Sequence, residues 1–216
     1  SPIGGWDPQV LVGQRIRFLG RSGDVLGVVG KKPVHLMKNS DREHASKITD
    51  LWVDIGAANR AEAEERLSVG DAGVIDSHSI DFPNSRLISR SIDNRIGAFV
   101  VLEALRRYAE KPGKARVVAA ATVQEEIAWH GGGALVCAHC INPQMAIVVD
   151  VTFATDHPSL EKKEIGEHKM GSGPVISRGA LISPVVFELL RETARAQNIP
   201  FSIHAVGRDT STNADA

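Results

Sequence analysis

The chain has 216 residues and a net charge of −1, with 43% of its residues apolar and 24% charged, a composition typical of one globular domain or two small ones. The near-neutral charge argues against a nucleic-acid partner, and the chain has no run of about 18 apolar residues that could span a membrane. Two cysteines are too few for a disulfide framework, and no basic and apolar leader opens the sequence, so we expect a soluble cytoplasmic protein.

The first part of the chain, residues 8–75, has the pattern of a small β-rich module. Residues 15–19 and 25–29 are separated by a glycine-containing turn, which predicts a β-hairpin. A further short strand is expected at 52–55 and a charged helix at 61–67. Because this region holds no catalytic constellation of its own, we expect it to serve assembly or substrate shaping.

From about residue 86 the pattern changes to alternating helices and buried strands. We expect helices at 92–109, 134–139 and 183–197 and buried strands at 116–123, 146–149 and 201–206. Strands that alternate with helices in this way predict an α/β fold whose central sheet is mostly parallel, with helices on its flanks.

Four acidic residues lie at the ends of these predicted elements. Asp93 opens the long helix, Glu125 and Glu126 follow the first buried strand, and Asp150 follows the second. In open parallel sheets ligands bind beyond the carboxyl ends of the strands, where such side chains converge. Packed acids repel one another unless a cation neutralises them, so this arrangement indicates a divalent metal site.

Each acid also has a simpler interpretation, which the sequence leaves open. Asp93 alone is a good helix N-cap, and the pair Glu125 and Glu126 alone is typical of a solvated turn. The combination favours the metal site because the two adjacent glutamates follow a strand with no charge in its last residues.

Longer motifs around these acids carry a resemblance to a known family. They are SIDNRIG at 91–97, VQEE at 123–126, VDVT at 149–152 with Asp156 and Pro158, IGGWD at 3–7, and the segment from Gly30 to Pro33 followed by His35. In this order and spacing the chain resembles the glutamyl and tetrahedral aminopeptidases, a family of dinuclear metallopeptidases that includes deblocking aminopeptidases and members misnamed endoglucanases.

The resemblance implies a fold of the zinc-peptidase type interrupted by an inserted domain. Residues 1–7 and 76–216 would form the catalytic α/β domain, and residues 8–75 the β-rich insertion that makes oligomer contacts. The family builds large closed homo-oligomers, among them dodecamers, and such compartments admit only unfolded peptides.

The resemblance also implies a role for each acid. Asp93 would bridge two divalent metal ions, zinc or cobalt, while Asp150 completes one ion and Glu126 the other. Glu125 would be the general base that takes a proton from the attacking water and delivers it to the leaving amine. The function implied is that of a metalloaminopeptidase that removes N-terminal residues from peptides.

Two histidine ligands used by the family would fall before Ser1 and beyond the segment Thr212–Ala216. We therefore expect the catalytic domain to be incomplete at both ends. Two alternatives follow. In the first, the chain is an inactive scaffold or assembly subunit. In the second, it is a glycoside hydrolase, an enzyme that also uses two carboxylates. Sugar-binding sites usually need aromatic side chains, and this chain has only three Trp and one Tyr.

Several other residues resemble functional motifs but are interpreted structurally. Cys137 and Cys140 form a C-x-x-C without the second pair that a zinc site requires, so we expect buried or half-buried thiols. His130 is expected to be exposed in a loop, and His157 lies in a turn that could line the pocket. Ser172 lacks the context of a nucleophile.

Overall fold

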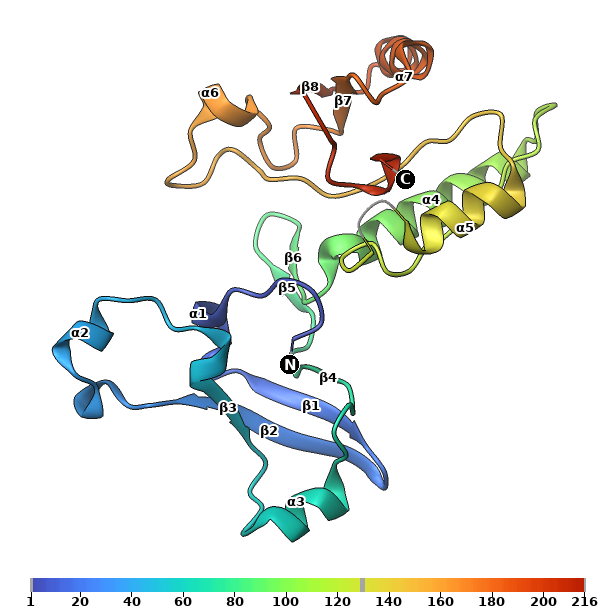
Figure 1. Ribbon diagram of the computed structural model, residues 1–216. Coiled ribbons are helices and arrows are strands. Elements are labelled where there is room, and N and C mark those ends of the chain that lie inside the picture. The colour runs from blue at the N-terminus through green and yellow to red at the C-terminus, as the bar shows by residue number, and fades with distance from the viewer. Residues whose placement is uncertain (1, 129–130, 216) are drawn as a thin grey trace. The chain divides into compact units, whose positions relative to one another are not determined.

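The computed structural model describes residues 2–128 and 131–215. The chain divides into two compact units, Ser1–Arg90 and Ser91–Ala216, which are coloured blue to green and green to red in Figure 1. The boundary between these units lies after Arg90, whereas the sequence places the end of the inserted domain at residue 75. The assignment of residues 1–7 and 76–90 to the catalytic domain stays a prediction.

A four-stranded antiparallel sheet forms the first unit, with its strands in the order β3–β2–β1–β4 (Figure 1). The strands are β1 (Arg15–Gly20), β2 (Gly23–Lys31), β3 (Leu51–Asp54) and β4 (Gly73–Ile75). β1 and β2 form the predicted hairpin, in which Arg15 pairs with Val28 and Gly20 with Gly23. The predicted strand at 52–55 is confirmed as β3, which pairs with β2.

Short elements complete this unit. They are α1 (Pro8–Leu11), the 3₁₀ turns Val34–Leu36 and Ile48–Asp50, α2 (Asn39–Arg42), α3 (Arg60–Arg66), and the antiparallel hairpin of β5 (Ile80–Phe82) and β6 (Arg86–Ile88). α3 is the predicted charged helix, and it begins where the Asn59 side chain accepts a hydrogen bond from the backbone N–H of Glu62 at 3.1 Å.

The second unit holds the long helices and a parallel strand pair. Its elements are α4 (Ile92–Glu110), α5 (Gly132–Ile141), α6 (Lys162–Ile165), β7 (Val175–Gly179), α7 (Pro184–Ala196), β8 (Ser202–Val206) and the 3₁₀ turn Asn213–Asp215. The three helices predicted in this region are confirmed as α4, α5 and α7. β7 and β8 pair in parallel with Val175 opposite Ser202, and α7 connects them as a β-α-β unit.

Two predicted buried strands are absent from this unit. Residues 116–123 and 146–149 belong to no strand, and their apolar side chains are exposed, for example 45% for Val118 and 55% for Ile147. The prediction was wrong because a strand requires a neighbour to complete its ladder, and no other described segment pairs with either run. The fold is therefore mixed α/β with an open sheet, and among the described residues parallel pairing is confined to β7 and β8.

The core of the second unit lies where α7 packs on β7. Ser183 accepts a hydrogen bond from the backbone of Val186, and Pro184 occupies the first turn, so the helix begins at the predicted residue. Phe187 is 1% exposed, and the guanidinium carbon of Arg178 lies 5.2 Å from the centre of its ring.

A buried histidine ties the preceding loop to β8. The backbones of Thr155 and His168 pair through a hydrogen bond of 2.7 Å, and the His168 ring lies 2.7 Å from the Ser202 hydroxyl and 3.0 Å from the Ile165 carbonyl. Since a carbonyl only accepts, Nε2 carries the proton and Nδ1 accepts from Ser202. Both ring nitrogens of His168 are thus used in hydrogen bonds that hold the fold together.

No helix within the described ranges is long and apolar enough to cross a membrane.

Candidate active site

The start of α4 places Asp93 and Asn94 outside regular helix geometry. Asp93 has ψ of 110°, and Asn94 has φ of −122° and ψ of 50°, with a cis peptide bond between them. The Oδ1 atom of Asn94 accepts a hydrogen bond from the Gly97 N–H at 2.8 Å, which is the contact that caps a helix. Asn94 therefore does the capping that the simpler interpretation assigned to Asp93, and the Asp93 carboxylate is not used for it.

Asp150 is held at the end of the segment 146–149 by two donors. Its Oδ1 atom accepts from Asn94 Nδ2 at 2.5 Å and from the backbone N–H of Val151 at 2.7 Å. Partial burial raises the pKa of Asp150, and the negative charge of Asp93 adds to this, while the two hydrogen bonds oppose it. The two segments that carry these acids therefore meet, although they are more than 50 residues apart in the sequence.

Glu125 and Glu126 sit in a tight turn that begins at Gln124. Gln124 adopts a left-handed conformation with φ of 67°, and its carbonyl accepts a hydrogen bond from the Ala128 N–H at 2.9 Å. Within this turn Glu125 is half-buried and Glu126 is exposed. The two adjacent side chains thus meet different surroundings, as their proposed division of roles requires.

The four acids Asp93, Glu125, Glu126 and Asp150, called the acid cluster below, influence one another through their charges. Partial burial raises the pKa of Glu125, and the charges of Asp150, Glu126 and Asp93 raise it further. Across residues 2–128 and 131–215, no lysine, arginine or histidine forms an ion pair with any of the four. The cluster therefore holds negative charge without a cationic partner from the described chain.

The side chains of the acid cluster are of the right chemical type to bind a divalent cation, but they are not arranged to coordinate one as they stand. Carboxylate oxygens on separate segments are suitable ligands for divalent ions, and an uncompensated group of acids attracts them. Within the described residues, however, no three His, Cys, Asp or Glu side chains lie close enough together to hold an ion as they stand. Coordination would take side-chain rotation and further donors.

The C-terminal turn packs against the segment that leads to Glu125. Asn213 donates a hydrogen bond from Nδ2 to the Thr122 hydroxyl at 2.9 Å. Asp215 holds this turn by accepting from the backbone N–H groups of Thr210 and Ser211. The sequence indicated no role for these residues, and in the structure they join the C-terminal turn to the segment that precedes Glu125.

The remaining sequence candidates lie apart from the cluster or outside the description. His157 is exposed, and its Nδ1 atom lies 2.6 Å from the Pro158 carbonyl. Cys137 is half-buried as expected, but Cys140 is exposed, which corrects the expectation for that thiol; both thiols are free. His130 lies outside the described residues.

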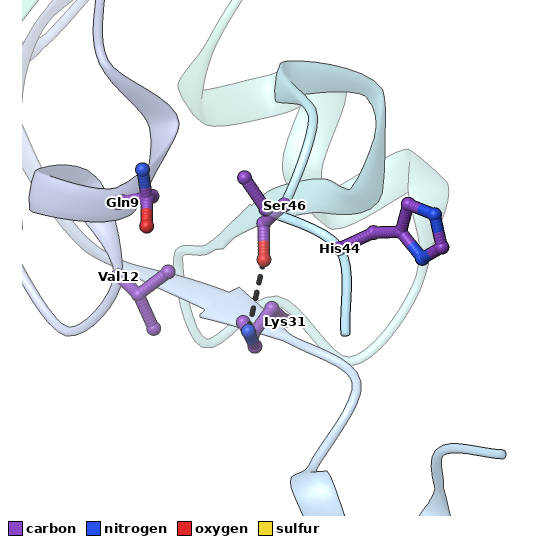
Figure 2. A pocket seen from close by; sticks show the side chains of 6 residues that line it. Gln9, Val12, Lys31, His44 and Ser46 are labelled. Carbon is purple, nitrogen blue, oxygen red and sulfur yellow. Dashed lines mark hydrogen bonds between the residues drawn. The ribbon is translucent and has the colours of Figure 1, made fainter. Parts of the chain in front are cut away.

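A separate hollow of about 250 Å³ lies in the first unit (Figure 2). Its walls include Lys31, whose ammonium donates to the Ser46 hydroxyl at 2.9 Å, and His44. The hollow contains none of the acids, so it is distinct from the candidate active site.

Comparison with known proteins identifies the class to which this fold and site belong. The sequence model of the M42 glutamyl aminopeptidases matches residues 1–216. The chain therefore belongs to the M42 glutamyl aminopeptidase family.

Individual relatives place the chain more closely. It is 35% identical to the lysyl aminopeptidase of Pyrococcus furiosus over 99% of this chain and 60% of that protein. It matches the TET aminopeptidase of Thaumarchaeota archaeon SCGC AB-539-E09 with a TM-score of 0.85 and 33% identity, covering 98% of this chain and 60% of that one. The TET1 peptidase of Pyrococcus horikoshii, described as able to assemble into a tetrahedron or a large octahedral shell, matches with a TM-score of 0.81 and 29% identity over 98% of this chain and 62% of that one. The chain thus spans about 60% of the length of these relatives.

Proposed function

We propose that this protein is a metal-dependent aminopeptidase that hydrolyses N-terminal residues from peptides at the acid cluster of the second unit. The observation that carries the proposal is the hydrogen bond from Asn94 to Asp150, which brings the segment of Asp93 to that of Asp150. The raised pKa of Glu125, caused by partial burial and by the charges of Asp150, Glu126 and Asp93, is in keeping with it. Membership of the M42 glutamyl aminopeptidase family supports the peptidase hypothesis over the glycoside hydrolase alternative.

In this proposal Asp93, Glu126 and Asp150 would hold two divalent ions, zinc or cobalt, and Asp93 would be the ligand that the two ions share. The chemistry that such ions supply is Lewis acidity, which polarises the scissile carbonyl and makes water a stronger acid. The distribution of hydrogen bonds supports the assignment of Asp150, because both of its donors reach Oδ1.

Glu125 acts as the general base in this scheme. A base must be ionised to accept a proton, and a raised pKa makes its carboxylate a better acceptor near neutral pH. Glu125 takes the proton of the attacking water and passes it to the amine that leaves. An aminopeptidase must also hold the free N-terminus of its substrate, and the metal ions together with the nearby acids would do so.

We further propose that the protein acts in the cytoplasm as a homo-oligomer, with residues 8–75 providing subunit contacts. The free cysteines fit a reducing compartment. The tetrahedral and octahedral assemblies described for the Pyrococcus horikoshii relative support a closed oligomer, of which a dodecamer is the form expected here.

A non-catalytic assembly subunit is the second candidate. It is favoured by one observation, namely that no three potential ligands among the described residues are close enough to hold an ion. The two candidates differ in a single property, which is turnover of peptide.

The experiment is mass spectrometry of an unblocked peptide incubated with the 216-residue chain and Zn²⁺ or Co²⁺. The aminopeptidase removes residues one by one from the N-terminus, spares the N-acetylated peptide and stops when EDTA is added. Glu125→Gln should lower the rate by about 10²-fold or more. Intact peptide in the presence of a folded chain would favour the assembly subunit.

A further inference from the structure

Asn94 connects two parts of the acid cluster with a single side chain. Its Nδ2 atom donates to Asp150 Oδ1 at 2.5 Å and to the Val149 carbonyl at 3.1 Å, while its Oδ1 accepts from the Gly97 N–H at 2.8 Å. Every polar atom of the amide is therefore used. The flipped amide would turn its oxygen toward a carbonyl and a carboxylate, so these contacts allow only one orientation.

The backbone is shaped to admit this side chain. Gly97 is buried, and a Cβ atom at this position would lie 2.1 Å from Asn94 Oδ1 and 2.9 Å from the Val149 carbonyl oxygen. No side chain larger than hydrogen fits there without displacing the amide. The close approach of α4 to the segment before Asp150 thus depends on glycine at 97 and asparagine at 94 together.

The contacts of Asn94 determine how the Asp150 carboxylate is oriented. The hydrogen bonds that described residues make to this carboxylate all reach Oδ1, from Asn94 and from Val151. This arrangement fixes the side chain and leaves Oδ2 without a donor from residues 2–128 or 131–215. A carboxylate held by one oxygen can offer the other to a cation without first losing rotational freedom.

We infer that Asn94 is a positioning residue that orients Asp150 for a divalent cation, an inference that rests on the proposed metal site. Asn94 also follows Asp93 directly in the sequence. One residue therefore couples the carboxylate proposed to bridge the ions to the carboxylate proposed to complete one of them.

The test separates positioning from helix capping by the choice of variant. In Asn94→Ser the short hydroxyl still caps α4 but lacks the amide N–H that reaches Asp150. We expect a melting temperature only a few degrees below that of the wild type, because two amide hydrogen bonds are lost while the cap is kept, and a Co²⁺ affinity that is about 10- to 100-fold weaker by calorimetric titration. The matched control is Asn59→Ser, which alters the cap of α3 in the first unit and should leave the Co²⁺ affinity unchanged.

An affinity in Asn94→Ser within twofold of the wild type would overturn the inference, and so would an equal loss in Asn59→Ser. A second measurement needs no metal. The denaturant midpoints of Asn94→Ser, Asp150→Ala and the double variant form a cycle, and we expect the double variant to lose less than the sum of the single losses.

The two measurements also separate this inference from the proposed function. If the wild-type chain binds no Co²⁺ while the cycle shows coupling, the metal site fails but Asn94 still orients Asp150. If the losses in the cycle are additive, the positioning role fails whether or not Co²⁺ binds.

Discussion

The pKa of Glu125 is raised by partial burial of its carboxylate and, in addition, by the negative charges of Asp150, Glu126 and Asp93. An acid whose pKa is raised in the folded state destabilises that state above its unfolded pKa, and the penalty disappears at lower pH, where the acid is protonated in both states. Glu125→Gln should therefore raise the melting temperature of the metal-free chain at pH 7 by about 2 °C.

The check is thermal unfolding of both chains, without metal, at several values of pH. The difference in melting temperature should shrink as the pH falls through the usual range of glutamate. A variant that is less stable than the wild type at pH 7 would show that the ionised Glu125 carboxylate does not destabilise the folded state.

The sequence could indicate which residues are candidates for the site, but not which contacts they make. The sequence placed Asp93, Glu125, Glu126 and Asp150 at predicted element ends, but the two strands on which this rested are absent, and the roles of the four acids stay predictions. The role of Asn94 could not be foreseen, because its main partner is 56 residues away. The only local signal is an asparagine three residues before a glycine, which is the spacing of a helix cap.

At the scale of the element, α4 carries an ion-pair network centred on Glu103. The guanidinium groups of Arg106 and Arg107 each lie 2.7 Å from its carboxylate and lower its pKa to about 2. A lowered pKa contributes stability that is present above about pH 4.5, the ordinary value, and is lost as the pH falls toward 2.

Glu103→Gln should accordingly lower the melting temperature at pH 7, with the difference closing toward pH 2. Circular dichroism at 222 nm, the usual wavelength for helices, follows this directly. Glu65→Gln, at an exposed position of α3, is the control and should show no such closing gap. A constant difference across the pH range would mean that the arginines do not stabilise the charged form.

α7 depends on one aromatic side chain for its packing. Phe187 is 1% exposed, so truncation to alanine removes buried surface and leaves a cavity, at a cost of about 3–5 kcal/mol in the free energy of unfolding. Val185, in the same helix, is 65% exposed, and Val185→Ala should change that energy by less than about 0.5 kcal/mol. Denaturant unfolding of the two variants compares these costs, and equal losses would contradict the packing described here.

Elements with a local signature were predicted well, and elements that need distant partners were not. The hairpin of β1 and β2 and the helices α4 and α7 follow from turn residues, caps and apolar spacing within each segment. The runs at 116–123 and 146–149 have the apolar composition of buried strands, yet composition does not provide the neighbour that a strand needs.

At the scale of the whole molecule, the family assignment rests on motifs spread over both units. The match to the M42 family covers residues 1–216, and the chain spans about 60% of the length of its relatives. The second unit contains the four acids, Asn94 and the C-terminal turn that bonds to Thr122. We therefore propose that the chemistry takes place in the second unit and that residues 8–75 provide the contacts for assembly.

The central claim is that the four acids form one site for divalent cations. Native mass spectrometry of the 216-residue chain with Zn²⁺ tests it most directly, with Asp93→Asn as the variant and Glu103→Gln as the control. We expect two ions per chain in the wild type and the control, and fewer in Asp93→Asn because the shared ligand is lost. A wild-type chain that binds no zinc, or an Asp93→Asn chain that binds the same number of ions, would contradict it.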